Sequence, residues 1–276
     1  MTALWTLLAL LCLGAGSYGL YRWLPQRRWR EARGHPLSSA DRQLLSEIFP
    51  PYETLSAEER ARLELLMQYF LRFKNITVLE GPALSREEEL LLASHACLLL
   101  LHQRAREPFA TVTNVFIMPA SYVERDNPVD PETGVPFHFE RLGELRERGP
   151  MIISREELQA LTSEDHNFVN IVVHEFAHEL DQSDGAFDGT PELGSAEAYR
   201  RWAQVMGQEF ERLRAQQATG EQTRIDPYAA TDEAEFFAVV AEHFFTAPRD
   251  LEEGHPELFG LYREFFGLDP RRWCAD

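Results

Sequence analysis

The chain is poor in cysteine and short of basic residues. Its 276 residues include three cysteines, Cys12, Cys97 and Cys274, and no two of them have the Cys-x-x-Cys spacing. This argues against a disulfide framework and a thiolate zinc site, and it agrees with a reducing compartment. Asp and Glu number 45 against 27 Lys and Arg, which gives a net charge of −18. Because so acidic a protein repels phosphate backbones, we expect no nucleic-acid partner.

Charge is missing altogether from the N-terminal segment. Residues 1–21 contain no Asp, Glu, Lys, Arg or His, and the stretch from Ala3 to Tyr21 is apolar apart from Thr6 and Ser17. As a helix, this stretch has about the length of the hydrocarbon core of a bilayer. Five arginines follow it, at positions 22, 27, 28, 30 and 33. A cleaved signal peptide carries its basic residues before the apolar run, so this order favours a retained anchor over a signal peptide or a buried globular helix.

The chain therefore divides into three predicted parts. These are a transmembrane anchor at 1–24, a basic linker at 25–36 and a single domain at 37–276. Because positive charge stays on the cytoplasmic side, the arginines place the N-terminus outside and the domain in the cytoplasm, at the inner membrane of a bacterium.

The pattern of the domain is α+β and mostly helical, with a small sheet backed by helices. Capping boxes at Ser56 and Ser85 predict the starts of two helices, the second of which is apolar nearly all round. The further helices expected are a brief one after Ser154 and longer ones at about 167–181, 195–218, 232–246 and 256–266. The strands expected are 75–80, 111–118 and 151–153, with an edge strand near 137–139 inside a long loop.

The strongest chemical signal is an HExxH motif. His174-Glu175-Phe176-Ala177-His178 lies in an apolar segment that predicts a buried helix. Residues four apart share one face of a helix, so His174 and His178 can bind one metal ion. Glu175 points beside that ion, which suits a general base that activates a zinc-bound water. The alternative is two ordinary helix histidines, but two imidazoles and a carboxylate are costly to bury without a partner. The motif predicts one zinc ion per chain.

A catalytic zinc site needs a third protein ligand, and the sequence offers two candidates. Asp184 stands where an extended motif would place its last ligand, but Asp181 replaces the glycine of that motif. The second candidate lies in the apolar segment 234–245, whose carboxylates are Glu235 and Glu242. These two are seven residues apart, share one face of a helix and, once buried, need a partner. We prefer Glu235 as the ligand and Glu242 as the acceptor that orients an imidazole, with swapped roles or ion pairs with arginine as the alternatives.

Two further residues are expected around the metal. Tyr228 lies just ahead of the segment that carries Glu235, and we expect its phenol to lie over the open metal position and stabilise an oxyanion. Ordinary packing of the ring is the alternative. Asp181, one helical turn after His178, is expected to lie behind the ligands and support them.

Two sequence blocks resemble those of a known family. HEFAHELD at His174–Asp181 and YAATDEAEFFAVVAEHFF at Tyr228–Phe245 are similar to the signature blocks of the Mlc titration factor A family of zinc-dependent peptidases. The segments Phe116–Pro119 and Gly149–Ser154 also look like family segments. The resemblance covers most of residues 40–270, and the paired blocks are much more specific than HExxH alone.

The resemblance implies a zincin-like fold, similar to the catalytic domain of anthrax lethal factor. It implies zinc bound by His174, His178 and Glu235, with Glu175 as the base and Tyr228 as the group that stabilises the transition state. It also implies peptidase activity of the aminopeptidase type and, from the enterobacterial members, a transcriptional repressor as a partner.

The prediction from the sequence is thus a membrane-anchored, gluzincin-type zinc metallopeptidase that hydrolyses peptide or protein substrates. The alternative is a membrane-held regulator that binds a transcription factor or another protein, with hydrolysis secondary. A hydrolase of another amide or of an ester is the third interpretation, because HExxH specifies a metal and a base but not a substrate.

Overall fold

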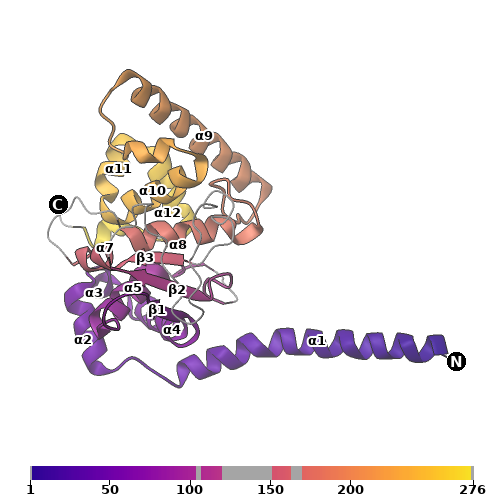
Figure 1. Ribbon diagram of the computed structural model, residues 1–276. Coiled ribbons are helices and arrows are strands. Elements are labelled where there is room, and N and C mark those ends of the chain that lie inside the picture. Colours follow the sequence, from indigo (N-terminus) through magenta and orange to yellow (C-terminus); the bar gives the residue numbers. More distant parts are fainter. Residues whose placement is uncertain (1, 104–106, 120–150, 163–169, 275–276) are drawn as a thin grey trace.

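The computed structural model describes residues 2–103, 107–119, 151–162 and 170–274 (Figure 1). Helices make up most of this part of the chain, and three strands form a small sheet. The prediction of a mostly helical α+β domain with a small sheet is therefore confirmed. The edge strand predicted near 137–139 lies outside the described residues.

Helix α1 (Thr2–Arg33) projects from the body of the molecule (Figure 1). Its last turns pack on helix α4 (Ala57–Phe73), where the rings of Trp29 and Tyr69 lie 4.7 Å apart and Glu31 pairs with Arg72 at 2.8 Å. The segment 25–36, predicted to be a linker, is thus helical as far as Arg33. The reason is tertiary packing, because burial of Trp29 and its neighbours against α4 extends the helix past its internal proline.

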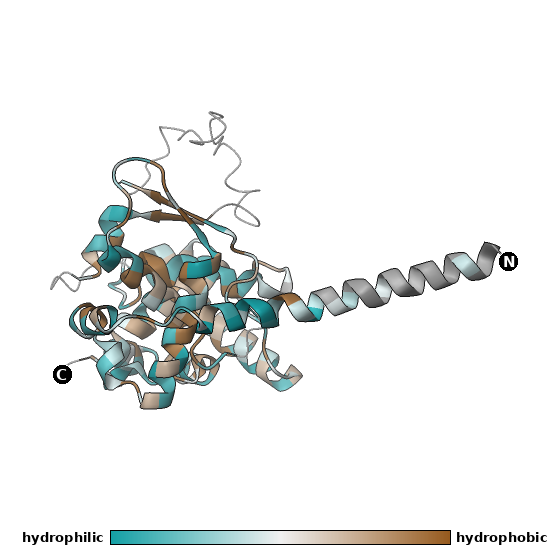
Figure 2. Ribbon diagram, turned by 90° about the horizontal axis from the view of Figure 1, so that it is seen from below, coloured by the Kyte–Doolittle hydropathy of each residue, from teal (hydrophilic) through white to brown (hydrophobic). Residues whose placement is uncertain are grey.

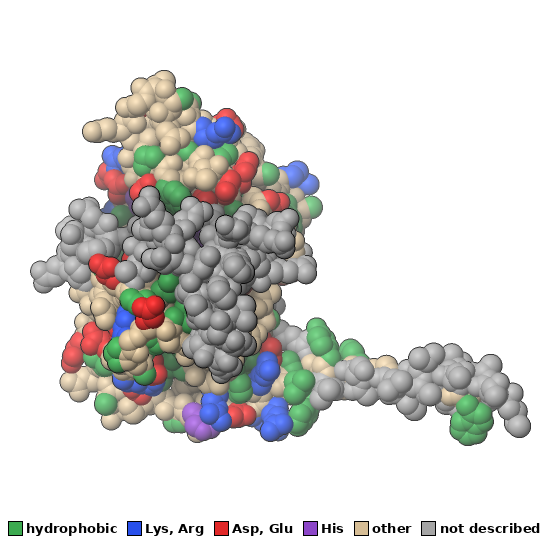
Figure 3. Space-filling model, viewed as in Figure 1, with side chains coloured by type: hydrophobic (Ala, Val, Ile, Leu, Met, Phe, Trp, Pro, Cys, Tyr) green, Lys and Arg blue, Asp and Glu red, His purple; other side chains and the backbone are tan. Residues whose placement is uncertain are grey.

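The projecting part of α1 is rich in exposed apolar side chains. The large ones are Trp5, Tyr18, Tyr21, Trp23 and Leu24. Figure 3 shows apolar side chains near the outer end of this helix and next to the body, and the body carries acidic side chains in both its upper and lower parts. Within the described part of the chain, no helix is long and apolar enough to cross a membrane. The structure therefore does not support the anchor predicted at 1–24, and the inner-membrane location stays a prediction.

Three helices of the N-terminal half begin with reciprocal side-chain caps. They are α2 (Ser39–Ile48), α4 and α5 (Arg86–Leu98), and the short α3 (Pro51–Thr54) lies between the first two. At the start of α4 the Ser56 hydroxyl accepts from the N–H of Glu59, and the Glu59 carboxylate accepts from the N–H of Ser56. Ser85 and Glu88 do the same for α5. These caps satisfy N–H groups that a helix leaves without partners, and both predicted helix starts are confirmed.

The sheet consists of β1 (Asn75–Val78), β2 (Asn114–Met118) and β3 (Met151–Ser154) in the order β1-β2-β3, with both pairs parallel. Val115, Ile117 and Ile153 are fully buried, so the sheet turns one face to the helices. Figure 2 shows the strands at one side of the helical body. All three predicted strands are present, and the first two are shorter than predicted.

The C-terminal half supplies most of the remaining helices. They are α7 (Arg155–Ala160), α8 (Ile171–Asp181), α9 (Ala196–Thr219), α10 (Glu233–Thr246), α11 (Pro248–Gly254) and α12 (Pro256–Phe266), with short 3₁₀ turns η2 (Gln182–Asp184), η3 (Pro227–Ala230) and η4 (Pro270–Arg272). Helix α10 is buried along nearly its whole length and packs on α8. Aromatic side chains fill the space between α9, α10 and α12, with Trp202, Phe237 and Tyr262 at ring distances of 5.6–5.7 Å. Packing in the core thus keeps α8 and α10, the helices that carry the predicted ligands, in contact with each other.

Candidate metal centre

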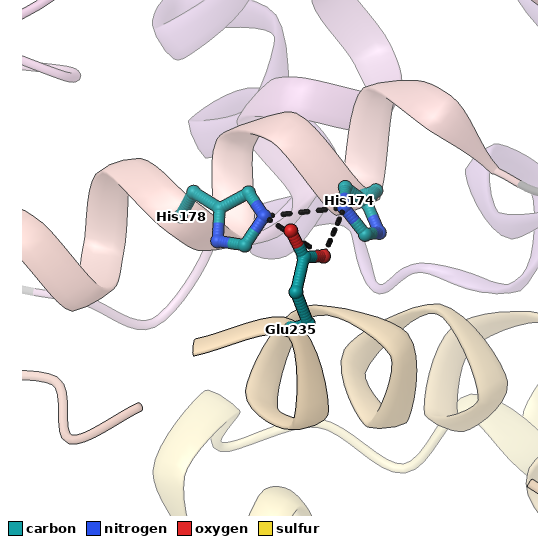
Figure 4. Close-up of side chains that lie close together, drawn as sticks. All are labelled: His174, His178 and Glu235. Carbon is teal, nitrogen blue, oxygen red and sulfur yellow. Dashed lines mark hydrogen bonds and ion pairs between the residues drawn. The ribbon is translucent and has the colours of Figure 1, made fainter. Parts of the chain in front are cut away.

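Helix α8 presents both histidines of the HExxH motif to α10. The side chain of Asn170 caps the helix by accepting from the N–H of Val173 at 3.1 Å. Val172, Val173, Phe176 and Ala177 are fully buried and hold the helix in the core. His174 and His178, one turn apart, therefore emerge on the same side, toward the first turn of α10 (Figure 4).

The first turn of α10 places Glu235 opposite the two imidazoles. Asp232 caps α10 by accepting from the N–H of Glu235 at 2.9 Å, which sets the start of the helix two residues before the ligand candidate. Glu235 is 1% exposed although it is a carboxylate. Figure 4 shows its oxygens directed between the two rings. A buried carboxylate in this position needs a positive partner.

The distances between the three side chains fit a tetrahedral metal site. The Nε2 atoms of His174 and His178 are 3.1 Å apart, and Oε2 of Glu235 lies 3.1 Å from the first and 3.5 Å from the second. For bonds of about 2.0–2.1 Å to zinc, the ligand atoms of a tetrahedron are about 3.3–3.4 Å apart. These three residues form the cluster of potential metal ligands in the described part of the chain. A His-His-Glu set with one open position is also the donor set of catalytic zinc sites.

Glu242 fixes the orientation of the first imidazole. Its Oε1 lies 2.5 Å from Nδ1 of His174, and its Oε2 accepts from the N–H of Asn170 at 3.1 Å. With Nδ1–H donating to a carboxylate, Nε2 of His174 keeps its lone pair for a cation. The role predicted for Glu242 therefore has the geometry it needs. The partners of these carboxylates include both imidazoles for Glu235, and the His174 ring and a backbone N–H for Glu242.

The electrostatics of the cluster favour a cation. Burial alone lowers the pKa of His174, but the carboxylates of Glu235 and Glu242 outweigh burial and raise that pKa to about 10. Burial likewise opposes the charge on Glu235, yet the two imidazoles lower the pKa of its carboxyl group below the ordinary value. The local field thus stabilises positive charge at the point where the three ligand atoms meet. A divalent cation supplies that charge more completely than a proton does.

The two residues predicted to be catalytic lie beside this cluster. Glu175 is half-buried next to His174 on α8, and its charge contributes to the raised pKa of that histidine. Tyr228 lies in η3 with its ring centroid 6.4 Å from that of His174, and it is 48% exposed. The ring of Tyr228 thus lies near His174 of α8 and is open to solvent. The structure brings both residues to the site, and their roles stay predictions.

The side chain of Asp181, one of the two aspartates considered from the sequence, lies within the described residues. Asp181 is fully buried, and burial raises the pKa of its carboxyl group to about 6. Its Oδ2 accepts from the N–H of Gly189 at 2.9 Å, and its support of the ligands stays a prediction. The side chain of Asp184, the alternative third ligand, lies outside the described residues. Sequence reasoning did not find Phe187, whose ring lies 5.1 Å from that of His178, because no motif marks it.

The sequence profile of the family described as glucose-regulated metallo-peptidase M90 matches residues 23–267. The chain belongs to this family. The family resemblance stated from the two sequence blocks is thereby confirmed.

Individual relatives agree with the family. The uncharacterized protein slr2042 of Synechocystis is 32% identical over 271 residues, which is 96% of both chains. Mlc titration factor A of Escherichia fergusonii is 31% identical over 227 residues, covering 80% of this chain and 83% of the relative. Mlc titration factor A of Cronobacter sakazakii is 32% identical over 222 residues, covering 78% and 82%. Membership of the family suggests a metallopeptidase, in keeping with the His-His-Glu cluster.

Proposed function

We propose that the protein is a zinc-dependent metallopeptidase of the gluzincin type. The observation that carries the proposal is the cluster of His174, His178 and Glu235, whose ligand atoms are 3.1–3.5 Å apart on two buried helices. Nitrogen and carboxylate donors in this number suit zinc better than magnesium or calcium, which prefer oxygen. Family membership supports the same class of activity.

Each nearby side chain has a defined task in this proposal. Bound zinc would polarise the scissile carbonyl and lower the pKa of water. Glu175 takes a proton from the attacking water and returns it to the leaving amine. Glu242 holds the His174 ring so that Nε2 faces the metal. Tyr228, exposed beside His174, donates its phenolic proton in a hydrogen bond to the developing oxyanion.

The proposal extends to substrates that carry a free amino terminus. The net charge of −18 favours cationic peptides by long-range attraction. The aminopeptidase character that the family resemblance implies points the same way. Paired chromogenic substrates test this extension, one with a free and one with an acetylated N-terminus. Equal rates on the two substrates would refute it without affecting the peptidase proposal.

Replacement of the base tests the peptidase proposal itself. Glu175→Gln is expected to bind zinc like the wild type and to hydrolyse a peptide panel about 10²–10⁴-fold more slowly, because general-base catalysis contributes about that much. The matched control is Glu179→Gln, the same change one turn along α8, where the side chain accepts a hydrogen bond from Thr111 at 2.6 Å. A Glu175→Gln protein that retains the wild-type rate would show that the mechanism is wrong.

A regulator that acts by binding is the second candidate function. The observation in its favour is the name of the enterobacterial relatives, which are titration factors of Mlc. If binding is the function, the Glu175→Gln protein should capture the same partner as the wild type and should rescue a deletion phenotype without hydrolysis. Rescue that requires Glu175 would instead favour the peptidase.

A further inference from the structure

Gly189 lies where three helices of the domain meet. Its N–H donates to Oδ2 of Asp181, the last residue of α8, at 2.9 Å. Its carbonyl accepts from Nε1 of Trp202 in α9, also at 2.9 Å. Its Cα faces the backbone of Glu233, the first residue of α10. One buried residue therefore connects the end of the histidine helix with the start of the glutamate helix.

The contact between Gly189 and Glu233 leaves no room for a side chain. The φ angle of Gly189 is +73°, in the left-handed region where glycine is favoured. A Cβ atom at this position would lie 2.2 Å from the carbonyl oxygen and 2.8 Å from the carbonyl carbon of Glu233. Both are backbone atoms, so no rotation of a side chain relieves the overlap.

The two elements that Gly189 joins carry the metal ligands. Asp181 stands three residues after His178 on α8, and Glu233 stands two residues before Glu235 on α10. The Nε2–Oε2 separation between His178 and Glu235 is 3.5 Å, and it depends on how closely the end of α8 approaches the start of α10. These two ends meet at the contact between Gly189, held by the end of α8, and the backbone of Glu233 at the start of α10.

We propose that Gly189 is a positioning residue of the metal centre. Because Gly189 has no Cβ, the first turn of α10 can pack directly against the 185–195 segment. This contact sets the position of Glu235 relative to His178. The proposal rests on the metal site of the proposed function. It gives a residue outside the ligand set an effect on metal affinity, which acts through the placement of α10 relative to α8.

The hydrogen bonds of Gly189 explain why the segment does not move away to make room. Asp181 holds its N–H and Trp202 holds its carbonyl, and both partners are buried in helices. A Cβ at 2.2 Å must therefore push the start of α10 by about 1 Å to reach ordinary contact. Metal–ligand distances tolerate only about 0.2 Å.

The test measures metal affinity and coordination in full-length Gly189→Ala. We expect its affinity for zinc, measured by competition with a chromophoric chelator, to fall about 10- to 100-fold. We also expect the visible absorption bands of its cobalt(II) complex to differ from those of the wild type, because these bands report ligand geometry. The matched control is Gly267→Ala, with φ +65° and a Cβ position 2.9 Å from Cβ of His102, at the end of α12. This control carries similar backbone strain and should keep wild-type affinity and spectrum.

A milder variant covers the case in which Gly189→Ala does not fold. Trp202→Phe keeps an aromatic ring in the core and removes the hydrogen bond to the Gly189 carbonyl. It should lower zinc affinity about 3- to 10-fold, whereas Trp29→Phe, on α1, should leave it unchanged. The inference would be overturned by wild-type affinity and an unaltered cobalt spectrum in folded Gly189→Ala, or by wild-type affinity in Trp202→Phe. Either result would leave the proposed function intact. A wild-type protein that binds neither metal would overturn the proposed function together with the inference.

Discussion

Glu242→Gln isolates the contribution of the carboxylate that lies behind the metal ligands. Glu242 contacts His174 Nδ1 at 2.5 Å with one oxygen and the N–H of Asn170 at 3.1 Å with the other. Glutamine has the same shape but only one accepting oxygen. Its NH₂ group must therefore face one of two N–H donors, either that of His174 or that of Asn170. The variant loses both a charge and one of two buried hydrogen bonds.

The size of the effect follows from what the carboxylate does for His174. It holds Nδ1–H as a donor and so keeps the Nε2 lone pair directed at the metal, and its negative charge makes the imidazole a better donor to a cation. Removal of such a partner typically lowers metal affinity about 10- to 100-fold, which is about 1.4–2.7 kcal/mol. We expect a loss in this range, because the contact is direct and only 8% of Glu242 is exposed.

The assay is a zinc competition titration with a chromophoric chelator at neutral pH. Glu233→Gln is the matched control, since it makes the same change on the same helix at an exposed side chain. Circular dichroism checks that both variants are folded. Wild-type zinc affinity in folded Glu242→Gln would refute the reasoning, and so would an equal loss in Glu233→Gln.

Three further predictions concern catalysis and stability. Tyr228→Phe should lower kcat about 10²- to 10³-fold with zinc affinity unchanged, which steady-state kinetics and metal analysis would check. Glu88→Gln should destabilise the domain by about 2–3 kcal/mol in urea unfolding at neutral pH, because Arg155 Nε lies 2.6 Å from the buried carboxylate. The Arg155 guanidinium lowers the pKa of Glu88 from 4.5 to about 2. The stabilisation is therefore complete above pH 4.5 and is lost as the pH falls toward 2, so the difference between variant and wild type should close over that range. Phe176→Ala should cost about 3–5 kcal/mol by the same measurement, since the ring, on α8, is fully buried and lies 4.5 Å from that of Phe109.

Local signals made much of the fold predictable from sequence. The capping boxes at Ser56 and Ser85 give helix starts because their hydrogen bonds span three residues of chain. Apolar periodicity gave α9, α10 and α12 to within a residue or so for the same reason. The helical end of α1 was missed, because it depends on Trp29 packing against a residue of α4.

The part of the site that lies within one helix could be predicted from the sequence. His174 and His178 share a face by helix geometry alone. The preference for Glu235 over Asp184 came from the sequence, but the packing of α10 on α8 is a contact between segments far apart in sequence that no local pattern predicts. The role of Gly189 could not be predicted from the sequence, because the need for glycine there comes from its contact with the backbone of Glu233 in α10.

The most direct test of the central claim is the zinc content of the purified full-length protein and its variants. The account predicts about one zinc ion per chain in the wild type and in Glu175→Gln, and a content below about one tenth of that in Glu235→Ala and His178→Ala. A folded Glu235→Ala protein that keeps one zinc ion per chain would contradict it, and Asp184 or Glu242 would then be the residue to replace next.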